Sequence, residues 1–204
     1  MDDYTTLALA TCNAIRVADP QATIIGPATS QFDPKFMDAF LASGVLEYLD
    51  GVSVHPYRQK RGPETAAADN ARLREAIDRH APAAKKGRLP IISGEWGYST
   101  DGKDVSLETQ AAYIARQQLF NLFTGVPLSI WYDWKNDGSD RKEREHNFGT
   151  VTEDLQPKPA YVAVQTLTRE LGGFRITRRH ATGSDEDWLL VLKNAAGETK
   201  LAAW

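Results

Sequence analysis

The stretch Leu89-Pro90-Ile91-Ile92-Ser93-Gly94-Glu95-Trp96-Gly97 places a short apolar run directly before a carboxylate that glycine and tryptophan flank. A short apolar run bounded by turn residues is typical of a buried strand. We therefore predict a strand over residues 89–93, with Glu95 at its carboxyl end. In sheets of parallel strands, the side chains at the carboxyl ends build the functional site. This stretch thus indicates both a parallel α/β fold and a place to look for chemistry.

The same unit of strand, loop and helix recurs along the chain. Strand-like segments begin near residues 23, 51, 90 and 128. Apolar residues at helical spacing predict helices over 4–18, 34–41, 64–80, 106–124 and 159–171. Residues 26–30 have the composition of a loop, and Gly44 is suited to cap the helix before it. Helical crossovers between successive strands imply a parallel sheet with right-handed connections.

Residues 174–204 differ in pattern from the rest of the chain. Short apolar segments at 188–192 and 201–204 predict antiparallel strands in place of helices. We therefore predict two domains. A partial (β/α) barrel spans residues 1–173, and a short β appendage over 174–204 forms the start of a β-sandwich.

The composition excludes several classes of protein. The 204 residues are 42% apolar and 25% charged, with a net charge of −3. This is typical of a soluble globular chain and argues against a nucleic-acid partner, which requires a basic surface. No apolar run approaches the roughly 18 residues of a membrane span, so we expect no membrane partner. The acidic start lacks an apolar signal core, so we expect no secretory signal in this chain. We make no prediction of its cellular compartment.

The sequence gives no support for a metal or a cofactor. Cys12 is the single cysteine, which excludes an internal disulfide and a cysteine zinc site. The four histidines are His55, His80, His146 and His180, and they lack metal-ligand spacing. The chain has no phosphate-binding loop, no dinucleotide glycine fingerprint and no serine nucleophile elbow. We therefore expect chemistry that uses neither a metal nor a bound cofactor.

Glu95 is the strongest candidate for a catalytic group. Its small neighbours allow a ligand to approach closely, and the adjacent aromatic ring offers a face on which a sugar can stack. A carboxylate at this position can act as the nucleophile of glycoside hydrolysis, which normally uses a pair of carboxyl groups. The alternative interpretation is a solvated charge at the end of a strand.

His55 and Tyr57 are candidates at the end of the strand before it. The two residues flank Pro56, and a spacing of two places both side chains on one face of a strand. Tyr57 can hydrogen-bond a carboxylate, while His55 can orient a substrate hydroxyl. The alternative is a polar strand end whose groups are satisfied by local hydrogen bonds.

Three tryptophans are candidates for sugar binding. Trp96 follows Glu95 directly, and Trp131 and Trp134 lie at the end of the fourth predicted strand. We predict that Trp131 and Trp134 have different roles, one facing a sugar and the other packed against the last helix. Two residues three apart beyond a strand do not share one face once the chain turns. The alternative is that these rings belong to the core.

Five short motifs occur along the chain in this order: Gly26-Pro27-Ala28-Thr29, His55-Pro56-Tyr57, Ser93-Gly94-Glu95-Trp96-Gly97, Trp131-Tyr132-Asp133-Trp134 and Lys158-Pro159-Ala160-Tyr161. Together they resemble the motifs of retaining glycoside hydrolases of clan A. The chain looks most like the family 39 and family 5-like enzymes. The resemblance covers strands five to eight of a (β/α)8 barrel and the start of the trailing β domain.

The resemblance implies a role for each matching residue. Glu95 matches the nucleophile at the end of strand seven, and Tyr57 matches the strand-six tyrosine that contacts it. His55 matches the histidine on the substrate side, and Trp131 or Trp134 matches the strand-eight tryptophan that floors the sugar subsite. The resemblance therefore implies a β-glycoside hydrolase, with the O-glycosidic bonds of oligo- or polysaccharides as substrate and no cofactor.

One part of the clan's pattern is missing. The general acid/base of the clan is a glutamate after an asparagine at the end of strand four, and no Asn-Glu dipeptide occurs in the 204 residues. The resemblance thus implies half of a (β/α)8 barrel that keeps the nucleophile side of the site. Other hypotheses are an inert carbohydrate-binding or scaffold half-barrel, or a fragment without function. Open sheet edges predict pairing with a complementary barrel half or with a second copy in a homodimer.

Overall fold

The computed structural model describes residues 2–204, which form two compact units. The first unit contains the residues up to Arg58, Thr65–Trp96 and Thr124–Ile130. The second unit contains Gln59–Glu64, Gly97–Phe123 and Trp131–Trp204. The two units interleave along the sequence, and the domain boundary expected between residues 173 and 174 stays a prediction.

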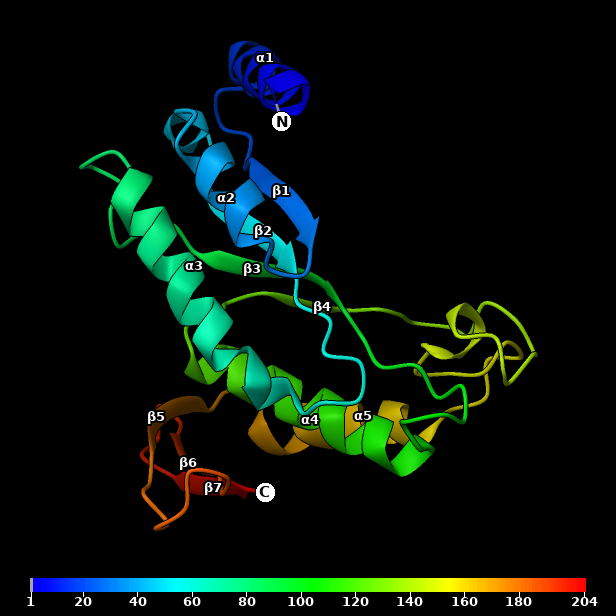
Figure 1. Cartoon of the computed structure of the whole chain (residues 1–204). Helices are drawn as coiled ribbons and strands as arrows, with labels where there is room; N and C mark the ends of the chain where they lie inside the picture. The colour runs from blue at the N-terminus through cyan, green and yellow to red at the C-terminus, as the bar shows by residue number, and fades with distance from the viewer. Residues whose placement is uncertain (1) are drawn as a thin grey trace. The chain divides into compact units, whose positions relative to one another are not determined.

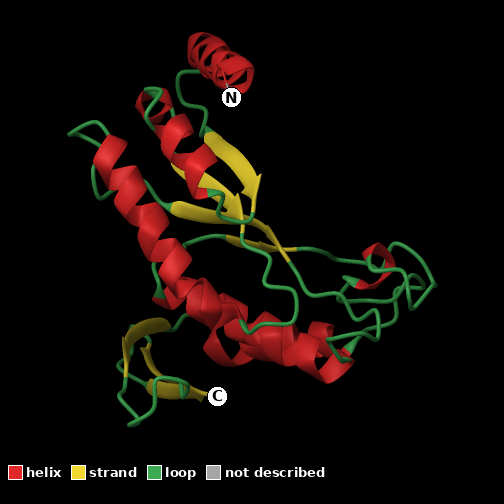
Figure 2. Cartoon of the chain, viewed as in Figure 1, coloured by secondary structure: helices red, strands yellow, loops and turns green. Residues whose placement is uncertain are grey.

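Helices and strands alternate through most of the described residues, as the sequence predicts (Figure 2). The helices are α1 (Asp2–Ala18), α2 (Pro34–Leu41), α3 (Ala67–His80), α4 (Leu107–Phe123) and α5 (Pro159–Leu171). The strands are β1 (Ile25–Ser30), β2 (Gly51–His55), β3 (Ile91–Trp96), β4 (Ser129–Trp131), β5 (Arg175–Arg179), β6 (Leu189–Lys193) and β7 (Thr199–Ala203). Short 3-10 helices are η1 (Val45–Glu47), η2 (Pro63–Ala66) and η3 (Glu145–Asn147). Among residues 2–204, no helix is long and apolar enough to cross a lipid bilayer.

Strands β1 to β4 form one sheet in sequence order. β1 pairs with β2, and β2 with β3, both in the parallel direction; Gly26 lies opposite Val52, which in turn lies opposite Ile91. Figure 1 shows these three strands side by side, with α2 and α3 along one face. The parallel direction confirms the prediction made from the repeating units.

The core of the first unit contains residues of this sheet and of the helices. Val52 and Val54 of β2 are buried in one cluster with Phe40 and Leu41 of α2 and Ile77 of α3. Burying each such side chain contributes on the order of 1.5–3 kcal/mol. The packing fixes β2 against its helices and so fixes the residues at the end of the strand.

The first strand differs from its prediction. It was expected over residues 23–25, followed by a loop, but β1 extends from Ile25 to Ser30. Pro27 is tolerated because β1 is an end strand, where one side of the backbone needs no partner. Ala28 has a φ of 64° at a bulge where the register with β2 shifts. A loop-like composition therefore folds as an irregular edge strand.

Two predicted boundaries are also wrong. β3 extends to Trp96, so Glu95 lies inside the end of the strand rather than beyond it. Helix α2 has Ala42 as its C-terminal cap. Gly44, with a φ of 87°, is the N-cap of the following 3-10 helix η1 and does not cap α2.

In the second unit, α4 packs along α5 and the C-terminal strands form a separate antiparallel sheet. Trp188, just before β6, contacts the rings of Phe120 and Phe123 of α4 at centroid distances of 5.7 and 5.6 Å. It also stacks on Trp204 at 5.5 Å. This aromatic cluster attaches the small sheet to α4, and the antiparallel pairing confirms the strands predicted near the C-terminus.

Candidate active site

The carboxyl ends of β2 and β3 carry the first group of candidate residues. Val54 of β2 lies opposite Ser93 of β3 in a parallel register. His55 is therefore next to the end of β3, and Glu95 lies at that same end of the sheet. Tyr57 follows two residues after β2 ends. The register of two buried parallel strands is what places these three side chains close together.

The hydroxyl of Tyr57 donates a hydrogen bond to Glu95. Its Oη lies 2.6 Å from Oε1 of the carboxylate, near the short end of the range for O–H···O hydrogen bonds. Nδ1 of His55 lies 3.7 Å from Oε2, which is beyond hydrogen-bond distance. The Glu95 side chain is 37% exposed. One neighbour thus orients the carboxylate while part of it stays open to a ligand.

Gly94 allows this close arrangement. A Cβ atom at Gly94 would overlap Oγ of Ser53 and would lie 3.5 Å from two ring atoms of His55. Ser53 is itself buried. Glycine is therefore required for β3 to approach β2 at the point where Glu95 and His55 meet.

Trp96 is the last residue of β3. Its ring is completely buried, with 0% of its surface exposed. A ring without exposed surface has no face on which a ligand stacks in this structure, and sugar binding by Trp96 stays a prediction.

Trp131 and Trp134 both belong to the second unit and differ in exposure. Trp131 is half-buried, and its Nε1–H donates to the carbonyl of Phe148 at 3.4 Å. Trp134 is 61% exposed, and its ring meets Tyr161 of α5 edge-on at 5.8 Å. The prediction was that one ring faces a sugar while the other packs against the last helix. In the structure, the ring that contacts the last helix is the more exposed of the two. The sugar-facing role of either ring stays a prediction.

Lys158, in the motif Lys158-Pro159-Ala160-Tyr161, is a buried charge. Its Nζ lies 3.3 Å from Oγ1 of Thr100, 3.3 Å from Oδ1 of Asn136 and 3.2 Å from the carbonyl of Asn147. Burial lowers the pKa of Lys158 to about 8, against the opposing effect of nearby carboxylates. Three acceptors match the three donors of an ammonium group, so Lys158 ties three loop segments to the start of α5.

Asp133 is another charge of the second unit whose pKa is shifted. Burial is the main cause that raises the pKa of its carboxyl group, and the nearby Asp137 raises it further. Its Oδ1 is buried without a hydrogen-bond partner among residues 2–204. The motif Trp131-Tyr132-Asp133-Trp134 contains this carboxylate, but its burial has no signal in the sequence.

Arg58 is a further buried charge that the sequence motifs do not indicate. It follows Tyr57 directly, is 5% exposed, and forms an ion pair with Asp69 of α3 at 2.7 Å. An arginine in a loop is usually exposed, so nothing in the sequence alone marked it as buried. Within the described part of the chain, no group of three or more His, Cys, Asp or Glu side chains is placed to hold a metal ion.

No protein-family model and no curated protein matches the chain. Solved structures do match it. A family 39 glycoside hydrolase from the gut symbiont Bacteroides cellulosilyticus WH2 is 24% identical, over 98% of this chain and 44% of its own, with a TM-score of 0.85. A glucosidase from Croceicoccus marinus is 19% identical, over 98% and 43%, with a TM-score of 0.74. A family 39 β-xylosidase from Caulobacter crescentus is 21% identical, over 94% and 43%, with a TM-score of 0.61.

These likenesses establish the fold. The chain spans less than half the length of the structures that it matches, and nearly all of it superposes on them. It is an α/β protein with the fold of half a (β/α)8 barrel followed by a short β appendage, which confirms the predicted fold class.

Proposed function

We propose that this chain carries the nucleophile half of a β-glycoside hydrolase site, with the O-glycosidic bond of an oligo- or polysaccharide as its substrate. The observation that carries the proposal is the hydrogen bond from Tyr57 to Glu95 at the carboxyl ends of two parallel strands. The likeness in fold to several glycoside hydrolases supports the same conclusion. In this role Glu95 attacks the anomeric carbon, Tyr57 orients the carboxylate, and His55 contacts a substrate hydroxyl.

A retaining hydrolase needs a second carboxyl group, about 5 to 5.5 Å from the first, to protonate the leaving oxygen. The clan's Asn-Glu dipeptide is absent from the sequence. We therefore propose that the acid comes from a complementary barrel half. The two end strands support this, since β1 exposes Ile25 and β4 exposes Ile130, with Leu128 just before it.

The second candidate function is carbohydrate binding without catalysis. The observation that favours it is the side chain of Trp134, which is 61% exposed. Aromatic rings with a free face bind apolar surfaces of ligands well. This function needs neither Glu95 as a nucleophile nor an acid from another chain.

Hydrolysis of 2,4-dinitrophenyl β-glycosides separates the two functions. Dinitrophenolate leaves without protonation, so these substrates test the nucleophile while the acid is missing. We expect the chain to release dinitrophenolate from the β-xyloside or the β-glucoside, and the Glu95→Gln variant to release none above the buffer rate. Equal rates in the parent and the variant would remove the assignment of Glu95. Calorimetry with xylose and glucose oligosaccharides then tests binding alone.

A further inference from the structure

Arg58 is the most deeply buried arginine among the described residues near the proposed site. Its Nη1 donates to Oδ2 of Asp69 at 2.7 Å, and its guanidinium lies over the ring of Phe32 at 5.1 Å from the centroid. Its Nε and Nη2 are buried and have no hydrogen-bond partner among residues 2–204. A buried charge is stable only when it is compensated, so Asp69 and Phe32 hold this side chain in place.

The backbone that leads into Arg58 is fixed as well. The N–H groups of Gln31 and Tyr57 both donate to the carbonyl of His55, at 2.8 and 2.9 Å. Pro56, between the two site residues, restricts the turn further. The segment from His55 to Arg58 is therefore anchored before Tyr57 by the edge of β1 and after it by the buried guanidinium.

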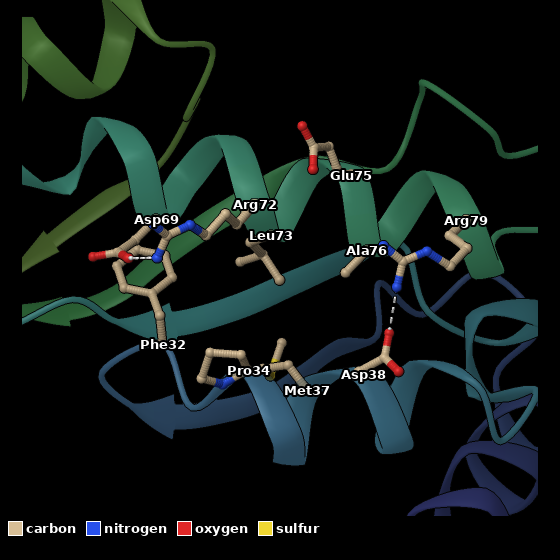
Figure 3. Close-up of a pocket in the computed structure, with 10 residues that line it drawn as sticks. All are labelled: Phe32, Pro34, Met37, Asp38, Asp69, Arg72, Leu73, Glu75, Ala76 and Arg79. Carbon is tan, nitrogen blue, oxygen red and sulfur yellow. Dashed lines mark hydrogen bonds and ion pairs between the residues drawn. The ribbon is translucent and has the colours of Figure 1, made fainter.

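The partner of Arg58, Asp69, lies in one of the helices that cover the sheet. Asp69 lies in the first turn of α3, where a carboxylate is favoured by the helix dipole. Figure 3 shows Asp69 and Phe32 at one end of a pocket of about 310 Å³ between α2 and α3, with the ion pair of Arg79 and Asp38 at the other end. Arg58 thus connects α3 to the residue that contacts Glu95.

We infer that Arg58 is a positioning residue, which holds the Tyr57 hydroxyl against Glu95 through the ion pair with Asp69 and the contact with Phe32. Tyr57 and Arg58 are consecutive, and each makes a side-chain contact that fixes its place: one with the carboxylate at the end of β3, the other with the first turn of α3. Loss of the guanidinium makes the backbone after Tyr57 more mobile. The Tyr57 hydroxyl is then no longer held in one position beside Glu95. The effect on hydrolysis rests on the proposed function, whereas the effect on the Tyr57 contact does not.

The test reads the Tyr57 hydroxyl directly, by NMR of protein labelled with carbon-13 at the tyrosine Cζ atoms. The Tyr57→Phe variant assigns the resonance, and the Glu95→Ala variant gives its position when the acceptor is absent. We expect Arg58→Met to move the resonance toward the Glu95→Ala position. Arg58→Lys keeps the charge but not the planar group, so its resonance lies between the parent and Arg58→Met.

Arg79→Met is the matched control, because it removes an arginine–aspartate ion pair of 2.9 Å from the same helix without touching Arg58. A purely structural role would lower Tm in Arg58→Met and leave the Tyr57 resonance where the parent has it. That result in a folded variant overturns the inference. If Arg58→Met does not fold, Arg58→Lys is judged by the same criterion.

Activity gives a separate readout. With a dinitrophenyl glycoside that the parent hydrolyses, we expect Arg58→Met to lower kcat by about 10- to 100-fold, because a carboxylate that Tyr57 no longer orients is misplaced for attack. We expect Arg79→Met to retain the parent's kcat. No turnover by the parent would count against the proposed function alone. An unchanged Tyr57 resonance would count against Arg58 alone, so the two failures are distinguishable.

Discussion

The hydroxyl of Tyr57 and the carboxylate of Glu95 lie 2.6 Å apart across the ends of two parallel strands. The two residues are 38 positions apart in the sequence, and the pairing of β2 with β3 brings them together. A hydrogen bond to a charged group contributes about 1.5–3 kcal/mol, which is enough to fix the direction of the carboxylate. The proposed chemistry depends on this contact.

The close approach of β2 and β3 predicts the effect of a single methyl group. Gly94→Ala would place Cβ onto Oγ of the buried Ser53 and against His55, so we expect a loss of about 1–3 kcal/mol in the free energy of unfolding. Gly26→Ala is the control, because its Cβ would meet only Leu49, at 4.0 Å. Urea unfolding measures both variants. Equal stabilities would show that the space around Gly94 is larger than the structure has it.

Lys158 predicts how stability changes with pH. Burial lowers its folded pKa to about 8, below the ordinary value of 10.5. Between these two pH values the unfolded chain binds the proton more tightly, so the contribution of Lys158 to stability rises as pH rises. The full difference corresponds to about 3 kcal/mol.

Urea unfolding of the parent and of Lys158→Met at pH 7, 8, 9 and 10 isolates this contribution. We expect the parent to gain stability relative to the variant above pH 8, and the difference to be constant below it. A difference that does not depend on pH over this range would mean that Lys158 keeps an ordinary pKa in the folded state.

Exposure predicts whether Trp131, at the end of β4, or Trp134, beyond it, responds to sugar. The ring of Trp134 is 61% exposed, whereas Trp131 is half-buried and donates to a backbone carbonyl. In protein labelled with 5-fluorotryptophan, we expect xylose or glucose oligosaccharides to move the fluorine resonance of Trp134 and not that of Trp131. Trp134→Phe and Trp131→Phe assign the two signals. No response from either would count against sugar binding at this strand.

The exposed end strands predict association. Ile25 of β1 is 43% exposed and Ile130 of β4 is 50% exposed, and strands of this kind recruit further strands. We expect a twofold homodimer near twice 22.6 kDa in sedimentation at micromolar concentration. Such a dimer would bury more than about 2,000 Å² and would bring two copies of Glu95 to one barrel mouth. A soluble monomer would contradict this assembly.

Most of the fold could be predicted from the sequence because its signals are local. Short apolar runs bounded by glycine or proline predicted β2 and β3, and helical spacing predicted α1 to α5 within a few residues. β1 was misplaced because Pro27 and a bulge at Ala28 are tolerated only in an end strand, which is a property of the sheet and not of the segment. The bounds of β1 therefore depend on its place in the sheet and not on its local composition.

The candidate site was predictable only where its residues follow strands. Glu95, Tyr57 and His55 lie at strand ends, and their order along the chain indicates that they meet. The burial of Trp96 and of Arg58 depends on what packs over them, and Lys158 is buried because three loop segments supply its acceptors. Such burial comes from tertiary contacts that composition and spacing do not encode.

Covalent trapping of the nucleophile tests the central claim most directly. The chain is incubated with 2,4-dinitrophenyl 2-deoxy-2-fluoro-β-xyloside and β-glucoside. Attack by the Glu95 carboxylate forms a bond to the anomeric carbon and releases dinitrophenolate, while the fluorine slows the next step. We predict that mass spectrometry of the digested protein finds the sugar on Glu95, and that Glu95→Gln stays unlabelled. A parent chain that stays unlabelled by both sugars, or a label that persists in Glu95→Gln, would contradict the account.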